Sequence, residues 1–373
     1  MGKYSNVKTP RFYVSVLQWL KAMKSLDVIE EEAEGLFGED PTIFGDLDSV
    51  AYINPSSTIS FFPTDTSSKL TFESKIGNYN QFMPANKNFC MVLGHDFGTH
   101  SDLGNTYAVF ALTCNNNTLF SSDDYSDEIN YATIGEYVSG FSAVMNNNAD
   151  SGDSDKLKLL LASSSINNAS HPARTFTFGS VLYGTYYDMP ISPDLNLNIS
   201  YETNNAKTSK SIKGSTFSNI MNSRPADWGG GGAWQMDKYP QTPVFRNARR
   251  SWDLSFSYMS DTDAFPVNGN SSYQYNTSDG YYTENNTPNP TSGFVDLNTS
   301  LGEFHSNILT GSDFFSVVWN KTLGNALPFV FQPDNTNNNP DQFAICKFVN
   351  DSLQYEQVAL NVYNIKLKIE EVW

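Results

Sequence analysis

Three segments of this 373-residue chain alternate apolar and polar side chains residue by residue, at 195–201, 252–258 and 363–369. In the second segment the apolar residues are Trp252, Leu254, Phe256 and Tyr258, and the residues between them are Asp253, Ser255 and Ser257. Successive side chains of a β-strand point to opposite faces of its sheet. The pattern therefore predicts antiparallel strands with one face on a core and the other in water.

The composition also favours sheet over helix. Aromatic residues make up 14% of the chain, led by 26 Phe and 20 Tyr, whereas only 17% of the residues are charged. Aromatic and β-branched residues fit a pleated, half-buried surface, and the residues that long helices need in bulk are scarce here. We therefore predict an all-β protein.

Short strand-like runs separated by turn-rich loops also fill the first half of the chain. They lie at residues 58–62, 69–74, 89–93, 107–112 and 174–182. A chain of this length exceeds the usual size of one core, so two domains are expected. We place their boundary near Met189-Pro190 and predict two β-sandwich or jelly-roll-like domains, at residues 45–190 and 191–373.

Residues 1–44 differ in character from the rest. Val16, Leu20 and Met23 recur at the spacing of an amphipathic helix, and Trp19 widens its apolar stripe. The sequence leaves two alternatives open. This helix either docks on a partner as a short N-terminal arm, which makes Val16, Trp19 and Leu20 candidate contact residues, or it packs on its own domain.

The charge of the chain excludes one class of partner. Carboxylates outnumber basic residues 40 to 23, which gives a formal net charge of −17. A protein that neutralises phosphates needs a basic surface, so direct contact with nucleic acid is not expected. No stretch reads as a membrane-spanning helix and the N-terminus does not read as a signal peptide. We expect the chain to assemble in the reducing interior of a cell, without membrane insertion.

The cysteines fit this reducing compartment. There are only three of them, and they lie far apart in the chain. This number and spacing indicate neither a disulfide framework nor a zinc cluster. Cys90 and Cys346 both lie in apolar runs. We interpret them as small core residues.

Few residues suggest chemistry. His95, Asp96 and His100 lie close in sequence, but a turn would be needed to bring the two histidines together, and no helical His-Glu-x-x-His pattern is present. We therefore interpret His95 as a structural residue at a strand end. The acidic loop 150–155 does not match a calcium-binding loop, and no serine lies in a Gly-x-Ser-x-Gly turn. We predict no catalytic residue, no metal site and no cofactor.

Two tryptophans, Trp228 and Trp234, flank the sequence Gly229–Ala233, which begins with four glycines. Tryptophan contributes strongly to protein interfaces, so this segment is one candidate for a contact loop. The alternative is a hinge with both rings packed on their own domain. The sequence favours neither, and both tryptophans are kept as candidate contact residues.

Several of these segments carry a resemblance to known proteins. The run 88–97, the strand that begins near Tyr107 and the run 178–184 resemble the discoidin-like, galactose-binding-type sandwich domains of phage virion proteins. Asp96 stands where that family usually has Asn. Binding residues of the broader fold lie on variable loops, so none is carried over to this chain.

The second half resembles tail-tip or minor tail proteins of tailed bacteriophages, particularly marine ones. The similar runs are residues 188–195, 249–258, 327–334 and 365–373. This resemblance implies a non-enzymatic structural protein of the virion, present in several copies in the tail or tail tip. Its implied partners are copies of itself and other virion proteins.

Three alternatives to a tail component stay open. The first is a capsid-associated or decoration protein. The second is an adhesin on the particle surface, in which residues 45–190 bind a host glycan. The third is a depolymerase that acts on surface polysaccharide, although no sequence motif supports this activity.

Overall fold

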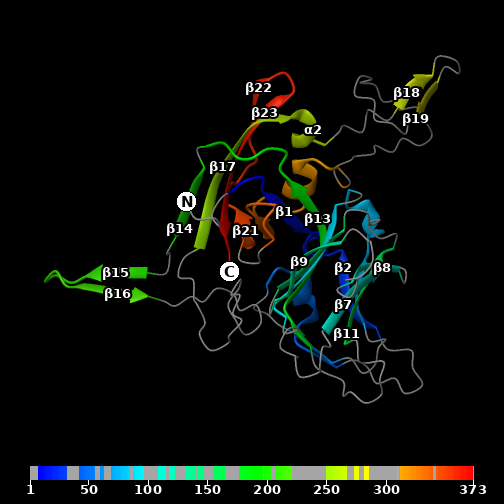
Figure 1. Cartoon of the computed structure of the whole chain (residues 1–373), viewed down its shortest axis with the longest axis horizontal. Helices are drawn as coiled ribbons and strands as arrows, with labels where there is room; N and C mark the ends of the chain where they lie inside the picture. The colour runs from blue at the N-terminus through cyan, green and yellow to red at the C-terminus, as the bar shows by residue number, and fades with distance from the viewer. Residues whose placement is uncertain are drawn as a thin grey trace.

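The computed structural model (Figure 1) describes a large part of the chain. The described residues are 7–31, 42–54, 59–62, 69–84, 87–95, 108–114, 117–121, 131–138, 141–146, 154–163, 176–195, 197–202, 206–220, 249–266, 273–276, 281–284, 309, 311–338 and 342–372. Antiparallel sheets dominate the regular structure, and the helices are few and short. The predicted all-β class is confirmed.

The described part of the first half contains strands and one α-helix. They are β1 (Arg11–Ser15), α1 (Val16–Ala22), β2 (Leu26–Glu31), β3 (Thr42–Phe44), β4 (Ile59–Phe62), β5 (Lys69–Ser74), β6 (Asn88–Leu93), β7 (Ala108–Cys114), β8 (Asn117–Ser121), β9 (Tyr131–Val138), β10 (Phe141–Asn146), β11 (Lys156–Ser163), β12 (Phe176–Phe178) and β13 (Ser180–Asp188). Two 3₁₀ helices lie at Leu47–Ala51 and Tyr79–Gln81.

The described part of the second half is also mainly β-strand. Its elements are β14 (Asn198–Glu202), β15 (Ala206–Lys210), β16 (Thr216–Ile220), β17 (Arg249–Ser260), α2 (Asp261–Ala264), β18 (Tyr273–Asn276), β19 (Tyr281–Glu284), β20 (Phe329–Gln332), β21 (Ala344–Phe348), β22 (Tyr355–Ala359) and β23 (Val362–Glu371). A π-helical turn spans Phe315–Trp319.

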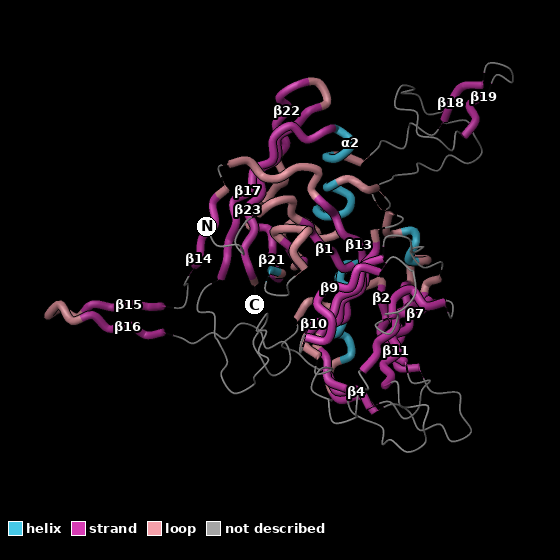
Figure 2. The backbone as a smooth tube through the Cα atoms, viewed as in Figure 1, coloured by secondary structure: helices cyan, strands magenta, loops and turns pink. Residues whose placement is uncertain are grey.

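An 11-stranded sheet is the largest unit of the structure (Figure 2). Its strands follow the order β14-β17-β23-β21-β20-β1-β13-β6-β10-β9, and β22 pairs with β23. Figure 2 shows β14 and β17 towards one end of this sheet and β9 and β10 at the other. β1 lies in the middle, where Phe12 is opposite Tyr187 of β13 on one side and Phe331 of β20 on the other. The earliest strand of the chain therefore connects strands from both halves of the sequence.

The alternation that predicted antiparallel strands is confirmed over most of β17 and β23; the exception is Tyr258, predicted on the apolar face of β17, which is exposed while Met259 is buried. Leu254 and Phe256 are buried while Asp253 between Trp252 and Leu254 is exposed, and Leu367 is buried between the exposed Lys366 and Lys368. At 195–201 the agreement is partial, because β14 begins only at Asn198. Leu195 precedes that strand in a turn and is fully exposed.

A second sheet packs on the half of the large sheet that contains β6 and β13. Its order is β2-β5-β11-β7-β8. One core cluster joins the two sheets, with Phe72 and Leu159 from the smaller sheet and Val92 and Tyr183 from the larger one. A second cluster lies where β17, β20, β21 and β23 meet the π-helical turn, around residues such as Phe12 and Val317.

The N-terminal segment is not an arm on the outside of the molecule. Arg11–Ser15 is the central strand β1, and the predicted helix follows it directly as α1, with the hydroxyl of Ser15 accepting a hydrogen bond from the backbone N–H of Gln18. Val16 and Leu20 have no exposed surface. Of the two alternatives that the sequence left open, the structure shows packing on the chain's own core.

The predicted boundary at Met189-Pro190 falls immediately after β13. Because β13 pairs with β1 and β1 pairs with β20, strands from both sides of this boundary belong to one sheet. A third core cluster also draws on both sides, with Phe89 and Leu182 from the first and Val330 and Ile345 from the second. The division into three segments stays a prediction.

Candidate functional site

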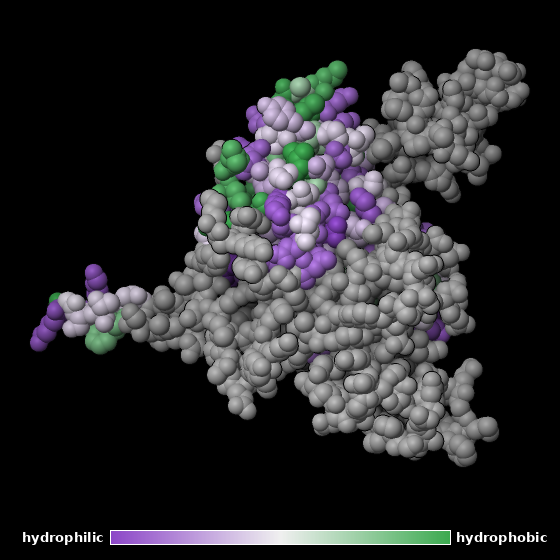
Figure 3. All heavy atoms as spheres, in the orientation of Figure 1, coloured by the Kyte–Doolittle hydropathy of each residue, from purple (hydrophilic) through white to green (hydrophobic). Residues whose placement is uncertain are grey.

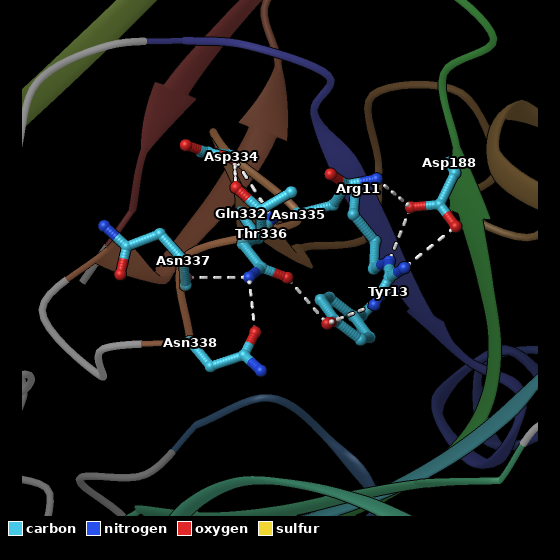
Figure 4. Close-up of polar contacts among 9 residues, drawn as sticks. All are labelled: Arg11, Tyr13, Asp188, Gln332, Asp334, Asn335, Thr336, Asn337 and Asn338. Atoms are coloured by element: carbon cyan, nitrogen blue, oxygen red, sulfur yellow. Dashed lines mark hydrogen bonds and ion pairs between the residues drawn. The ribbon is translucent and has the colours of Figure 1, made fainter.

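A cluster of polar side chains lies where β1, β13 and β20 meet (Figure 4). The guanidinium of Arg11 donates two hydrogen bonds to the carboxylate of Asp188, from Nε to Oδ1 at 2.6 Å and from Nη2 to Oδ2 at 2.9 Å. Asn335 donates to Oδ1 of the same carboxylate at 3.0 Å. The Arg11 guanidinium also lies over the ring of Tyr186, 4.5 Å from its centroid. We call the junction cluster the set of residues Lys8, Arg11, Tyr13, Tyr186, Asp188, Gln332, Asp334, Asn335, Asn337 and Asn338.

The cluster continues along β1 to the loop after β20. The hydroxyl of Tyr13 donates to Oε1 of Gln332 at 2.7 Å, and the amide of Gln332 donates to the carbonyl of Asn337 and to Oδ1 of Asn338. Lys8 pairs with Asp334 at 2.9 Å. The cluster thus joins three stretches that are far apart in the sequence, near residues 8–13, 186–188 and 332–338.

The electrostatics of the junction cluster point to a structural role. Burial alone would lower the pKa of Arg11, but the hydrogen bonds and charge interactions with Asp188 and Tyr13 outweigh it and raise that pKa above its ordinary value. Burial raises the pKa of Tyr13 above its ordinary value, although Arg11 opposes this. Arg11 therefore stays charged and Tyr13 stays protonated at any physiological pH. Neither group is poised to exchange a proton.

A buried lysine lies outside the junction cluster, beside the π-helical turn. Lys321 follows the π-helical turn, has no exposed surface, and donates to the carbonyl oxygens of Leu309 at 3.0 Å and Ser316 at 2.9 Å. Burial lowers the pKa of this ammonium from 10.5 to about 8, and the charge of Asp313 offsets the effect only in part. Carbonyl groups therefore hold Lys321 in place, but burial of its charged ammonium costs free energy in the folded state.

This cost predicts a pH-dependent stability. The folded pKa of Lys321 lies below the unfolded one, so between pH 8 and 10.5 the unfolded chain holds a proton that the native chain has lost, and native stability rises with pH. Relative to Lys321→Met, the wild type should gain up to about 3 kcal/mol between pH 7 and 10.5. Urea unfolding of both proteins across this range measures the difference. The titrations of tyrosine and cysteine cancel, being common to both, and a flat difference would contradict the assignment.

The three cysteines are buried, as predicted for Cys90 and Cys346, and Cys114 is buried with them. Burial raises the pKa of the Cys90 and Cys346 thiols. His95, which the sequence placed at a strand end, is also buried and follows β6 closely. His100 lies outside the described residues.

The thiols should accordingly be inert in the native protein. Since the thiolate is the reactive form and a thiol reagent needs access to it, we expect no native cysteine to react with Ellman's reagent at pH 8. All three should react after denaturation in urea. Rapid labelling of the native protein, located by peptide mapping, would show that one of these core positions opens.

The predicted contact residues of the helix are not on the surface. Val16 and Leu20 are fully buried and Trp19 is 6% exposed, in the core cluster that also contains Val92 and Tyr183. Trp19 packs on Phe82 with ring centroids 5.8 Å apart. The structure therefore places these three residues in the chain's own core, which is the second of the two alternatives that the sequence left open. Trp228 and Trp234 lie outside the described residues.

Two projecting parts of the structure expose large apolar side chains instead. One is the β15–β16 hairpin, with Ile212 and Phe217, and the other is the end where β22 turns into β23, with Val358 and Leu360 (Figure 3). Tyr258, on β17, is also exposed and adopts φ 65°, a strained conformation for a bulky residue. Sequence reasoning missed both parts, because nothing in short runs such as 358–360 separates exposed apolar residues from core ones.

Within the described ranges, no three His, Cys, Asp or Glu side chains gather in a way that suits a metal ion. None of the described helices is long and apolar enough to cross a membrane. The acidic loop 150–155 lies mostly outside the described residues. Comparisons with protein-family models, curated proteins and solved structures find no match for the chain. Its function has to be inferred from its own residues.

Proposed function

We propose that the chain is a structural component of a virus particle, assembled in several copies in the tail or tail tip. In this role it holds a fixed shape and binds other subunits, including copies of itself. Catalysis has no part in the proposal.

The proposal rests on two features of the structure. The central strands are held together by a network of hydrogen bonds, and parts that extend from them expose apolar side chains. The junction cluster ties β1 to β13 and β20, through residues such as Arg11, Asp188 and Gln332. Ile212 and Leu360 are exposed on parts that extend from this body (Figure 1). Groups of exposed large apolar side chains mark interaction surfaces on soluble proteins. A subunit of an assembly needs both properties.

The resemblance to tail proteins adds support because its segments are neighbours in space. The runs 249–258 and 365–373 fall on β17 and β23, which pair over most of their length. The run 327–334 falls on β20, two places further along the same sheet. Three of the four similar runs therefore fall on the same half of one sheet.

Mass spectrometry of purified particles from the source of the chain tests the proposal. We expect its peptides at constant stoichiometry with the major virion proteins. A few copies per particle fit a tail tip, and hundreds fit a coat on the tail tube or capsid. Peptides found only in the soluble fraction of infected cells would overturn the proposal.

A further inference from the structure

The β15–β16 hairpin differs in charge from the rest of the chain. Its residues 206–220 contain Lys207, Lys210 and Lys213 but no carboxylate, whereas the whole chain carries −17. Neither Lys210 nor Lys213 pairs with a carboxylate among the described residues. The hairpin is therefore a basic extension of an acidic protein.

The hairpin is also poorly supported by its own molecule. Among the described strands, β15 and β16 pair only with each other, and the hairpin extends away from the body (Figure 2). Ile212, at the turn, is fully exposed, and Phe217 is 61% exposed. A two-stranded hairpin is at best marginally stable alone in water, and its outer strand edges are open to further pairing. We call Lys210, Ile212, Lys213 and Phe217 the hairpin tip.

The opposite combination of charge and apolar surface occurs where β22 turns into β23. Leu360 is 84% exposed and Val358 is 42% exposed, and Glu356 on the same strand is exposed as well. The exposed Asp261 adjoins this turn, because its backbone N–H donates to the carbonyl of Asn361. We call Glu356, Val358, Leu360 and Asp261 the β22–β23 tip.

We propose that the hairpin tip of one copy docks on the β22–β23 tip of the next copy. The inference rests on the proposed function, which requires that copies of the chain bind one another, and it names the surfaces that do so. Apolar side chains at both tips would be covered, and the lysines of one copy would face the carboxylates of the other. Complementary charge of this kind selects the partner and its orientation.

The proposed contact joins two different surfaces, so its geometry is head to tail. A contact between unlike surfaces does not end at a dimer. It closes into a ring when the rotation between copies permits, and otherwise extends into a filament.

The first test is the mass of the protein in solution, measured by light scattering at increasing concentration. We expect wild-type multimers that dissociate at high salt, since the exposed charges are then screened. Ile212→Asp and Leu360→Asp should each weaken association by about 30-fold or more, because each places a charge in an apolar contact. Leu195→Asp, at a fully exposed leucine that belongs to neither tip, is the matched control and should leave association unchanged.

Mixing the two broken variants distinguishes this contact from any symmetric one. Ile212→Asp retains an intact β22–β23 tip, and Leu360→Asp retains an intact hairpin tip. An equimolar mixture should therefore form one-to-one dimers and nothing larger. Melting temperatures within about 2 °C of the wild type would show that the variants are folded.

Each outcome decides between the proposals. If the wild type forms multimers and both variants do too, the docking contact is wrong while the structural role stands. If the mixture stays monomeric, the two tips are not partners. A wild-type protein that is monomeric at every concentration overturns the docking contact. Absence of the chain from purified particles separately overturns the structural role.

Discussion

Gly184→Ala is expected to lower the free energy of unfolding by about 3 kcal/mol or more, because overpacking against a backbone cannot be relieved by a rotamer change. Gly184 on β13 is opposite Ser15 at the end of β1. A Cβ atom at this position would overlap the carbonyl oxygen of Val14 and lie 2.8 Å from the amide nitrogen of Val16. The central strand would have to move away from its neighbour.

Urea unfolding followed by tryptophan fluorescence measures this effect. Gly214→Ala is the matched control, since Gly214 lies in the turn of the β15–β16 hairpin with nothing near its missing Cβ. The cost there should be about 1 kcal/mol at most, from the positive φ alone. Equal effects at the two glycines would mean that β1 and β13 do not approach as closely as the structure has them.

Arg11→Ala should destabilise the protein by about 3 kcal/mol, the lower end of the range for breaking a buried ion pair. The substitution removes both hydrogen bonds to Asp188 and the contact with the ring of Tyr186. Arg11→Lys should recover only part of this loss, since an ammonium cannot make the paired contact of a guanidinium.

An exposed ion pair supplies the comparison for Arg11. Lys75 and Asp27 are 2.7 Å apart, and each side chain is about half exposed. Lys75→Ala should cost less than about 1 kcal/mol, as is usual for surface pairs. A loss from Arg11→Ala no larger than that of Lys75→Ala would show that the junction cluster does not hold the sheet together.

Much of the fold could be predicted from local pattern. The alternation in β17 and β23 indicated both the strands and their buried faces, because a period of two in sequence becomes a face in a sheet. β5 matches its predicted range, and α1 was recognised from the spacing of Val16 and Leu20. Such patterns indicate whether an element is a strand or a helix and which of its faces is buried.

Local sequence patterns do not predict which parts of the molecule an element packs against. The spacing of Val16 and Leu20 predicts an apolar stripe but not whether its own core or another subunit covers it. The ion pair between Arg11 and Asp188 spans 177 residues, and neither residue is unusual in its local sequence. The exposed tips were missed for a related reason, since exposure depends on where the whole strand lies in the fold.

The place of β1 in the sheet sets the order in which the protein can complete its fold. Tyr13 and its partner Gln332 are 319 residues apart, and the chain is synthesised from its N-terminus. While the ribosome makes the residues between them, β1 gains β13 as a neighbour well before β20 has been synthesised. Contacts of such long range fold slowly, and an open strand edge is prone to wrong pairing in the meantime. The yield of native protein should therefore depend on how well the nascent chain is protected during that interval.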